Sequence, residues 1–221
     1  MEPRVNIKPP PMIAYDPPRG PVEVIHADAH LLVVSKPSGL LSVPGKNFAD
    51  CLEARLRLEW PEALLIHRLD MDTSGIMVFA RTALAQRHLN WQFERRQVRK
   101  SYVARVAGRV AGRAGFVALP LIADWPNRPL QMVDFARGKP AFTRWEVEAR
   151  GAESTRLDLY PRTGRSHQLR VHCLEMGHPI LGDRFYGGPR ASRLMLHART
   201  LDLRHPDGGA WHRFEAPVPF E

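Results

Sequence analysis

Residues 65–81 limit most strongly what this chain can fold into. They read L-I-H-R-L-D-M-D-T-S-G-I-M-V-F-A-R, a polar segment at 67–75 followed by an apolar run at 76–80. A short apolar run bounded by turn residues predicts a strand that is buried on both faces. Polar side chains on a loop that enters such a strand are often the ones that carry chemistry. The same letters also fit Arg68 and Asp70 as a pair that only caps a turn.

The remaining patterns predict many strands and few helices. Strands are expected at residues 22–26, 30–35, 76–80, 102–106, 116–119, 141–148, 155–160, 194–203 and 211–215, with a short extended piece at 41–43. Helices are expected at residues 49–60, 83–95 and 167–176. Ser166 is expected to cap the last helix, and Gly177 to end it. Because strands and helices do not alternate strictly, the predicted class is α+β, with a mixed, mostly antiparallel central sheet flanked by helices.

The chain has 221 residues, of which 44% are hydrophobic, enough for a sizeable core. Residues 1–20 are proline-rich and favour extended polyproline structure over packing, so we expect a tail there and a single domain at 21–221. No apolar run approaches the roughly 20 residues of a membrane helix, and the N-terminus resembles neither a secretion signal nor a transit helix. We therefore expect a cytoplasmic protein with no membrane partner. Cys51 and Cys173 are far apart in the sequence and fit reduced thiols better than a disulfide framework.

The net charge is +9, and it comes from 27 arginines against 5 lysines. Arginine pairs phosphates with a planar fork and stacks on bases, so an arginine-rich chain indicates a nucleic-acid partner. A basic surface kept for solubility, or a genome that favours arginine codons, would give the same excess. Residues 81–113 contain nine basic residues and one acid, Glu94, which makes a phosphate-facing surface the better interpretation.

Two further stretches contain candidate functional residues. In T-G-R-S-H-Q-L-R-V-H, residues 163–172, Arg170 flanks a helical stripe formed by Leu169, Cys173 and Met176. From that position it could reach a carboxylate, although an ordinary surface arginine fits the pattern as well. In R-K-S-Y-V-A, residues 99–104, Tyr102 opens a strand after a basic run. It is either a core residue or a ring that stacks on a nucleobase.

Several of these motifs together resemble the RluA family of RNA pseudouridine synthases. The family pattern H-R-L-D-x-x-T-S-G is matched without a gap at residues 67–75. K-P-S-G matches at 36–39, K-x-Y-x-A at 100–104, G-R-x-H-Q-[IL]-R-x-H at 164–172, and H-P-I-x-G-D at 178–183. The similarity extends from about residue 22 to the end. The segment D-W-P-N-R-P, residues 124–129, resembles the RluA branch, which lacks the S4 module of many relatives.

The resemblance implies a pseudouridine-synthase fold with a catalytic cleft, and isomerisation of uridine to pseudouridine in structured RNA. In that reaction the C1′–N1 bond breaks, the base turns, and C1′ joins C5, so no redox step occurs and no cofactor is needed. For the RluA branch it implies a stem-loop of large-subunit rRNA and the tRNA anticodon stem-loop as substrates. The target base must leave its stack to react, which costs a few kcal/mol. A monomer without a protein partner is the default expectation.

The resemblance also assigns roles to particular residues. Asp70 would attack C1′ or take a proton from the sugar, held ionised by Arg170 nearby. Tyr102 would stack on the turned base and is a candidate for taking the C5 proton. Arg68 would fill the gap that the flipped uridine leaves, and Leu169 would form an apolar wall beside the ring. The remaining substrate-binding candidates are His67, Thr73 and Arg165.

Two other kinds of function remain open from the sequence. A non-catalytic RNA-binding protein would use the basic face alone. A metal-dependent nuclease would need clustered carboxylates, and Asp70 with Asp72 is the only close pair near a strand. We expect no metal site, because His167, His172 and His178 do not follow the spacing of zinc ligands.

Overall fold

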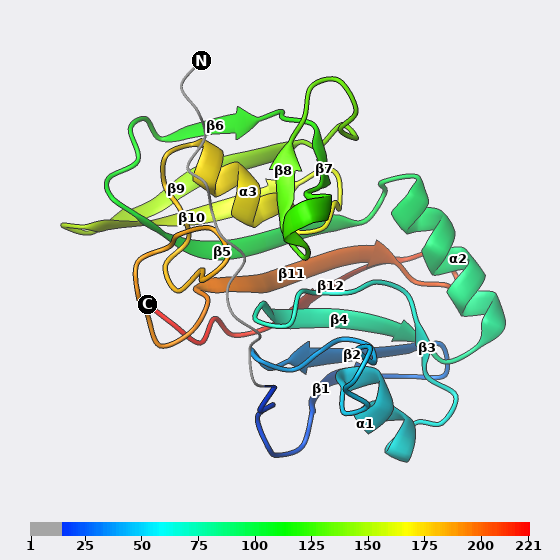
Figure 1. Ribbon diagram of the computed structural model, residues 1–221. Coiled ribbons are helices and arrows are strands. Elements are labelled where there is room, and N and C mark those ends of the chain that lie inside the picture. The colour runs from blue at the N-terminus through cyan, green and yellow to red at the C-terminus, as the bar shows by residue number, and fades with distance from the viewer. Residues whose placement is uncertain (1–14) are drawn as a thin grey trace. The chain divides into compact units, whose positions relative to one another are not determined.

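The computed structural model describes residues 15–221, and its contacts group into two compact units (Figure 1). The Asp70 unit consists of Tyr15–Val103 and Leu196–Glu221, and the Arg170 unit is Ala104–Met195. Residues 1–14 of the expected tail lie outside the described part. Within residues 15–221, no helix has the length and the apolar character needed to span a membrane.

The Asp70 unit combines a mixed sheet with two helices. Its elements are β1 (Glu23–Ala27), β2 (Leu31–Lys36), α1 (Leu52–Glu59), β3 (Leu64–Leu65), β4 (Ser74–Ala80), α2 (Ala83–Glu94), β11 (Leu196–Arg204) and β12 (Trp211–Glu215). The strand order is β1-β2-β4-β11, with β3 added to β4 and β12 added to β11. The β4–β11 pair is parallel, whereas the β1–β2, β2–β4, β3–β4 and β11–β12 pairs are antiparallel. Strand β5 (Arg99–Ala107) begins in this unit and ends in the other.

Strand β4 is buried along its whole length because a helix covers each face of the sheet (Figure 1). Ile76 and Val78 face one cluster, which includes Ala85 and Leu89 of α2. Met77 and Phe79 face a second cluster, which includes Leu52 and Leu56 of α1. Successive side chains of a strand point to opposite faces, so a strand covered on both sides needs an unbroken apolar run. The prediction for residues 76–80 is confirmed.

The Arg170 unit is built on antiparallel strands and one helix. Its elements are β6 (Ala114–Val117), β7 (Leu121–Ala123), the 3₁₀ turn η1 (Trp125–Asn127), β8 (Gln131–Val133), β9 (Thr143–Arg150), β10 (Ser154–Pro161) and α3 (Gln168–Glu175). Strand β9 lies between β10 and β6, while β7 and β8 form a separate hairpin that packs on α3 (Figure 1). The core between hairpin and helix contains Leu121, Leu130, Val133, Val171 and Tyr186.

The predicted α+β class is confirmed, and most elements lie within a few residues of their expected bounds. The β10–β9 register shifts between Arg156 and Leu157, which places a bulge in β9. Residues 41–43 form no strand; the Ser42 hydroxyl bonds the Leu69 backbone instead. Strands β3, β7 and β8 were not predicted.

Two details of the chain start and of the helix caps differ from what local propensity suggests. The tail residues Tyr15 and Pro18 pack on the fold: the Tyr15 hydroxyl donates to the Asp50 carbonyl at 2.9 Å, and the Pro18 carbonyl accepts from Arg55. Ser166 does not cap α3. His167 occupies the cap position with a φ of 52° and makes no capping side-chain bond.

Candidate active site

Asp70 lies on a tight turn at the entrance to β4. The Thr73 N–H donates to the Asp70 carbonyl at 3.2 Å, which closes the turn. The Asp70 side chain is half-buried and Arg68 is exposed, whereas Thr73 is buried. The turn therefore presents Arg68 and Asp70 outward and places Thr73 in the packing beneath them.

A cradle formed by residues 36–42 fixes this turn from below. Lys36 is fully buried, and its ammonium donates to the carbonyls of Pro37, Leu40 and Met71 at 2.6–2.9 Å. The Ser42 hydroxyl donates to the Leu69 carbonyl at 2.6 Å and accepts the Leu69 N–H at 3.1 Å. A buried charge needs a full set of polar partners. The K-P-S-G motif is thus an anchor for the residues on either side of Asp70.

The Ser74-Gly75 pair allows β4 to approach β11 closely. Gly75 has a φ of +114°, and a Cβ built there would lie 2.2 Å from the Ala198 carbonyl oxygen. Next to it the Ser74 hydroxyl and His197 Nδ1 form a buried hydrogen bond of 2.7 Å. A side chain at position 75 would push the parallel strands apart. The last two residues of the H-R-L-D-x-x-T-S-G motif are therefore architectural.

Tyr102 belongs to the same unit as Asp70 and interacts with it electrostatically. Its ring packs against the cluster that contains Leu69. Burial raises the pKa of the Tyr102 hydroxyl, and the negative charge of Asp70 raises it further. The phenol is consequently neutral at physiological pH, with its hydroxyl proton in place.

His67 takes a structural position beside the site. Its Nε2 accepts the Val78 N–H at 3.1 Å, so the ring proton is on Nδ1, and the ring stacks on Phe93 with 4.9 Å between centroids. The Lys100 ammonium lies 5.9 Å from the Phe93 centroid. Burial, together with the Lys100 charge, lowers the pKa of His67 to about 3, and burial lowers the pKa of Lys100. His67 is therefore neutral and is not poised to bind phosphate.

Arg170 is buried in the Arg170 unit and is not an ordinary surface residue. Its guanidinium forms a two-pronged ion pair with Asp183 at 2.7 and 2.8 Å, and both groups are at most 2% exposed. Asp183 also accepts the N–H groups of Phe185 and Tyr186. The rings of those residues lie 4.9 and 5.2 Å from the guanidinium carbon. The H-P-I-L-G-D motif thus supplies the carboxylate that orients Arg170.

Gln168 organises the turn that leads into α3. Its Oε1 accepts the Thr163 hydroxyl and the Arg165 N–H at 2.7 and 3.0 Å. Its Nε2 donates to the Phe142 carbonyl and to the Thr143 hydroxyl. Residues 168–173 are all buried, so the expected one-sided stripe is wrong, and Met176 is only half-buried. Leu169 is 7% exposed, and Arg165, half-buried, donates to the Pro140 carbonyl.

The three histidines considered for metal binding each have another bond. Nδ1 of His167 bonds the Tyr186 hydroxyl, Nδ1 of His172 bonds the Thr143 hydroxyl, and Nδ1 of His178 bonds the Ala107 carbonyl. Across residues 15–221, no group of three or more His, Cys, Asp or Glu side chains is arranged to hold a metal ion.

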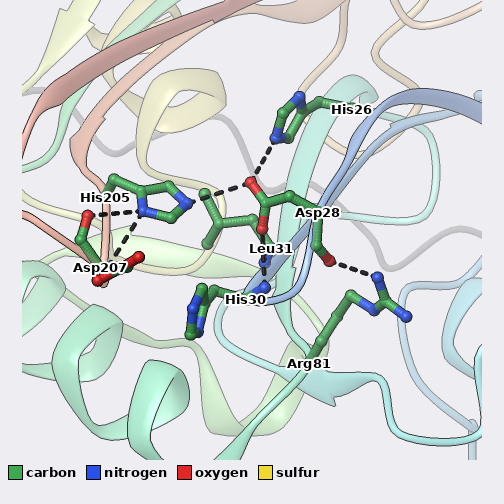
Figure 2. Close-up of polar contacts among 7 residues, drawn as sticks. All are labelled: His26, Asp28, His30, Leu31, Arg81, His205 and Asp207. Carbon is green, nitrogen blue, oxygen red and sulfur yellow. Dashed lines mark hydrogen bonds and ion pairs between the residues drawn. The ribbon is translucent and has the colours of Figure 1, made fainter.

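A second cluster of titratable groups surrounds Asp28, away from the motifs. Its carboxylate bonds Nε2 of His26 at 2.6 Å and Nε2 of His205 at 3.1 Å, and accepts the His30 and Leu31 N–H groups (Figure 2). Burial would raise the pKa of Asp28, but the hydrogen bonds from His26 and the two backbone N–H groups hold it well below its usual range. The cluster links the β1–β2 turn to the β11–β12 turn through hydrogen bonds, so its role is structural.

The basic segment 81–113 is not one continuous phosphate-facing surface. Arg81 is paired with Glu62, Lys100 is enclosed beside His67, and Arg105 donates to the Ser154 hydroxyl. The exposed basic residues of this segment in the Asp70 unit are Arg87, Arg95, Arg96 and Arg99.

Exposed tryptophans accompany these arginines. Arg99 and Arg204 lie 5.2 and 4.9 Å from the ring centre of Trp211, and Arg95 lies 5.8 Å from that of Trp91. Both tryptophans are 45% exposed. In the described part of the chain, none of these three arginines is ion-paired with a carboxylate. We call these five residues the Arg–Trp patch.

Each unit contains part of the predicted residue set. The Asp70 unit holds His67, Arg68, Asp70, Thr73 and Tyr102, and the Arg170 unit holds Arg165, Leu169 and Arg170. Sequence reasoning assigned no role to four supporting residues: Lys36, Ser42, Asp183 and His197. Lys36 and Asp183 lie within matched motifs, so the motifs could have pointed to a role for them. Ser42 and His197 lie outside every matched motif.

Comparison with known proteins establishes the family of the chain. Residues 30–175 match the family model described as RNA pseudouridylate synthase. Two relatives named dual-specificity RNA pseudouridine synthase RluA are similar over nearly their whole lengths. The Escherichia coli K12 protein is 50% identical over 214 residues, covering 93% of this chain and 98% of the relative. The Pasteurella multocida protein is 48% identical over 217 residues, covering 95% and 99%.

Solved structures give the same result for the fold. Human RNA pseudouridylate synthase domain containing 1 superposes with a TM-score of 0.77 at 27% identity, covering 91% of this chain and 85% of that one. Human RNA pseudouridylate synthase domain containing 4 gives 0.75 at 26% identity, covering 89% and 88%. The expected pseudouridine-synthase fold is confirmed, and the chain belongs to the RNA pseudouridylate synthase family of isomerases.

Proposed function

We propose that this protein isomerises uridine to pseudouridine in stem-loops of both tRNA and large-subunit rRNA, with Asp70 as the catalytic carboxylate. Family membership supports the reaction, and the printed names of the relatives, dual-specificity synthases, support two RNA substrates. The single observation that carries the role of Asp70 is its position. Asp70 is a half-buried carboxylate, and the residues on either side of it, Leu69 and Met71, are bound from below by Ser42 and Lys36.

Asp70 acts on the ribose while the base changes its point of attachment. The carboxylate either attacks C1′ or removes a sugar proton, and the C1′–N1 bond breaks. The base turns and C5 bonds to C1′, while the carboxylate leaves C1′ or returns the sugar proton. C5 then loses its proton to solvent or to a base, and N1 takes up a proton. Arg170, held rigid by Asp183, supplies positive charge to the same uridine, and Leu169 lies beside the ring.

Tyr102 contacts the base as a neutral phenol. Its raised pKa makes the phenolate scarce at physiological pH, so stacking and hydrogen-bond donation suit it better than acceptance of the C5 proton. Arg68, exposed next to Asp70, enters the stack in place of the flipped uridine. Thr73 and His67 support the turn from within the fold, and Arg165 supports the turn before α3.

The Arg–Trp patch supplies phosphate contacts. Exposed guanidiniums beside indole rings suit an RNA backbone, because arginine pairs phosphates and aromatic rings accept bases. We further propose that residues 21–221 work as one catalytic domain in the cytoplasm, as a monomer that needs no protein partner, no metal and no cofactor.

The test uses RNA whose uridines carry tritium at C5, since C5 loses its proton during isomerisation. The wild-type protein should release tritium from a tRNA anticodon stem-loop transcript. Asp70→Asn keeps the shape of the side chain and removes its charge, so release should fall below detection while RNA binding in a filter assay is retained.

Asp72→Asn is the matched control, because Asp72 is a half-buried carboxylate in the same turn. It should release tritium at close to the wild-type rate. Release that survives Asp70→Asn, or that is lost equally in Asp72→Asn, would remove Asp70 from the proposed role.

A further inference from the structure

The loop between β7 and β8 carries an exposed aromatic side chain that the reaction leaves without a task. Trp125 is 65% exposed, and the Arg128 guanidinium carbon lies 3.8 Å from the centre of its ring. An indole left in water loses the stabilisation that burial would give it. A guanidinium against one face of an indole leaves a flat, polarised surface on the other.

Hydrogen bonds within the loop hold its backbone in one conformation. The Asp124 N–H donates to the Leu130 carbonyl at 2.9 Å, and the Leu130 N–H donates to the Asn127 carbonyl at 3.1 Å. The Asn127 side chain donates to the Asp124 carboxylate at 2.9 Å. Pro126 lies inside the 3₁₀ turn, where its fixed φ is compatible with the backbone. Trp125 is therefore held in place before any partner arrives.

The same loop is connected to the helix that carries Leu169 and Arg170. The Tyr186 hydroxyl accepts the Gln131 N–H at 2.9 Å and bonds Nδ1 of His167, the residue before α3, at 2.7 Å. Leu130 and Val133 share a buried core with Val171 of α3. One hydrogen-bonded and packed scaffold therefore places Trp125 and the two α3 residues. An RNA loop that binds at α3 would meet Trp125 in a fixed geometry.

We propose that Trp125, backed by Arg128, is a stacking platform for a second, unpaired nucleobase of the substrate loop, distinct from the uridine that reacts. This inference rests on the proposed function. Sequence-tolerant recognition of single-stranded RNA uses aromatic rings on which bases stack, with nearby positive charge for the phosphate. Trp125 provides the ring and Arg128 the charge, and the platform selects RNAs whose loop has an unpaired base at the matching distance.

The experiment compares steady-state kinetics of tritium release for Trp125→Ala, Trp125→Leu and Trp125→Phe on a tRNA anticodon stem-loop transcript. Stacking of one base predicts that KM rises about tenfold for the Ala and Leu variants, while kcat stays within about twofold. Trp125→Phe should recover most of the loss, because it restores an aromatic face. Trp125→Leu separates stacking from simple apolar contact, since it keeps the bulk without the ring.

Phe135→Ala is the matched control, because Phe135 is 74% exposed at the other end of the same hairpin, and no ring or cation of the described residues stacks on it. Its KM should equal that of the wild-type protein. A second measurement places 2-aminopurine in the RNA loop. Its fluorescence should be quenched by the wild-type protein and by Trp125→Phe, but much less by Trp125→Leu.

Three results would overturn the inference. One is an unchanged KM for Trp125→Ala. Another is an equal rise for Phe135→Ala, and the third is a wild-type oligomer that Trp125→Ala dissociates in sedimentation, which would assign Trp125 to a protein contact. Failure of the proposed function is distinguishable, because the wild-type protein would then release no tritium from any stem-loop.

Discussion

The substitution Gly75→Ala tests whether the approach of β4 to β11 fixes the Asp70 turn. Gly75 pairs with Ala198 across the parallel strands, and its φ of +114° is disfavoured for any residue with a Cβ. The added Cβ would lie 2.2 Å from the Ala198 carbonyl oxygen and 2.6 Å from its nitrogen. Both atoms are backbone, so no side-chain rotation relieves the overlap.

The cost of Gly75→Ala has two parts. The backbone conformation costs roughly 1–2 kcal/mol for a residue with a side chain. Restoring ordinary contact distances of about 3.5 Å requires the strands to separate by ~1 Å, which breaks pairing bonds and leaves buried groups unsatisfied at about 1–3 kcal/mol each. The total is roughly 3–6 kcal/mol, and for a chain of this length the melting temperature should fall by about 10–20 °C.

Gly187→Ala is the control for the backbone term alone. Gly187 has a φ of +70°, and an added Cβ would have no atom within 4 Å. Its substitution should cost only this backbone part, roughly 1–2 kcal/mol, measured by urea denaturation beside Gly75→Ala. At a temperature where both variants are folded, only Gly75→Ala should lower tritium release, because the strand it displaces begins four residues after Asp70. Equal losses of stability in the two variants would refute the reasoning.

Three further predictions concern buried polar groups. Asp183→Asn should lower the free energy of unfolding by about 3–5 kcal/mol in thermal melts, since it leaves the Arg170 charge buried without its carboxylate; a loss under ~1 kcal/mol would contradict this. Ser74→Ala should cost about 1–3 kcal/mol in urea, because buried His197 Nδ1 loses its partner, and an unchanged midpoint would count against that bond. His67 has a folded pKa of about 3, below its ordinary 6.5, so the unfolded chain takes up a proton first and stability falls as the pH drops between these values. The fall should reach at most about 1.4 kcal/mol per pH unit and be absent from His67→Gln, as urea titrations at neutral and acidic pH would show.

Sequence reasoning was strongest where one local pattern determines one structure. The buried strand predicted at residues 76–80 is present in β4, because a helix lies on each face of the sheet. The helix predicted at residues 83–95 matches α2 almost to the residue. Strands β3, β7 and β8 contain two or three residues each, too few for a period to be visible. Their existence depends on partners elsewhere in the chain.

Side-chain partners explain the other misses. The strand expected at residues 116–119 forms at 114–117, where Gly115 leaves room for the Trp145 ring that would otherwise lie 2.6 Å from a Cβ. Ser166 looked like a helix cap by residue type, but Gln168 already bonds the turn before α3. Trp145 is far from Gly115 in the sequence, and Gln168 also bonds the distant residues Phe142 and Thr143, so local propensity could not reveal either arrangement.

The motif at residues 67–75 shows how a run of matched letters predicts a backbone arrangement that no single residue would reveal. His67 bonds the backbone of β4, the Leu69 backbone is bound by Ser42, and Gly75 makes room for β11. Arg68 and Asp70 are the letters left without such a structural task, and they are the two that we propose meet a substrate. Most letters of the motif are therefore required by the backbone geometry that presents the other two. A chain that matches all of them has the means to build the turn, so the match predicts a carboxylate that the turn presents and not merely a carboxylate in the sequence.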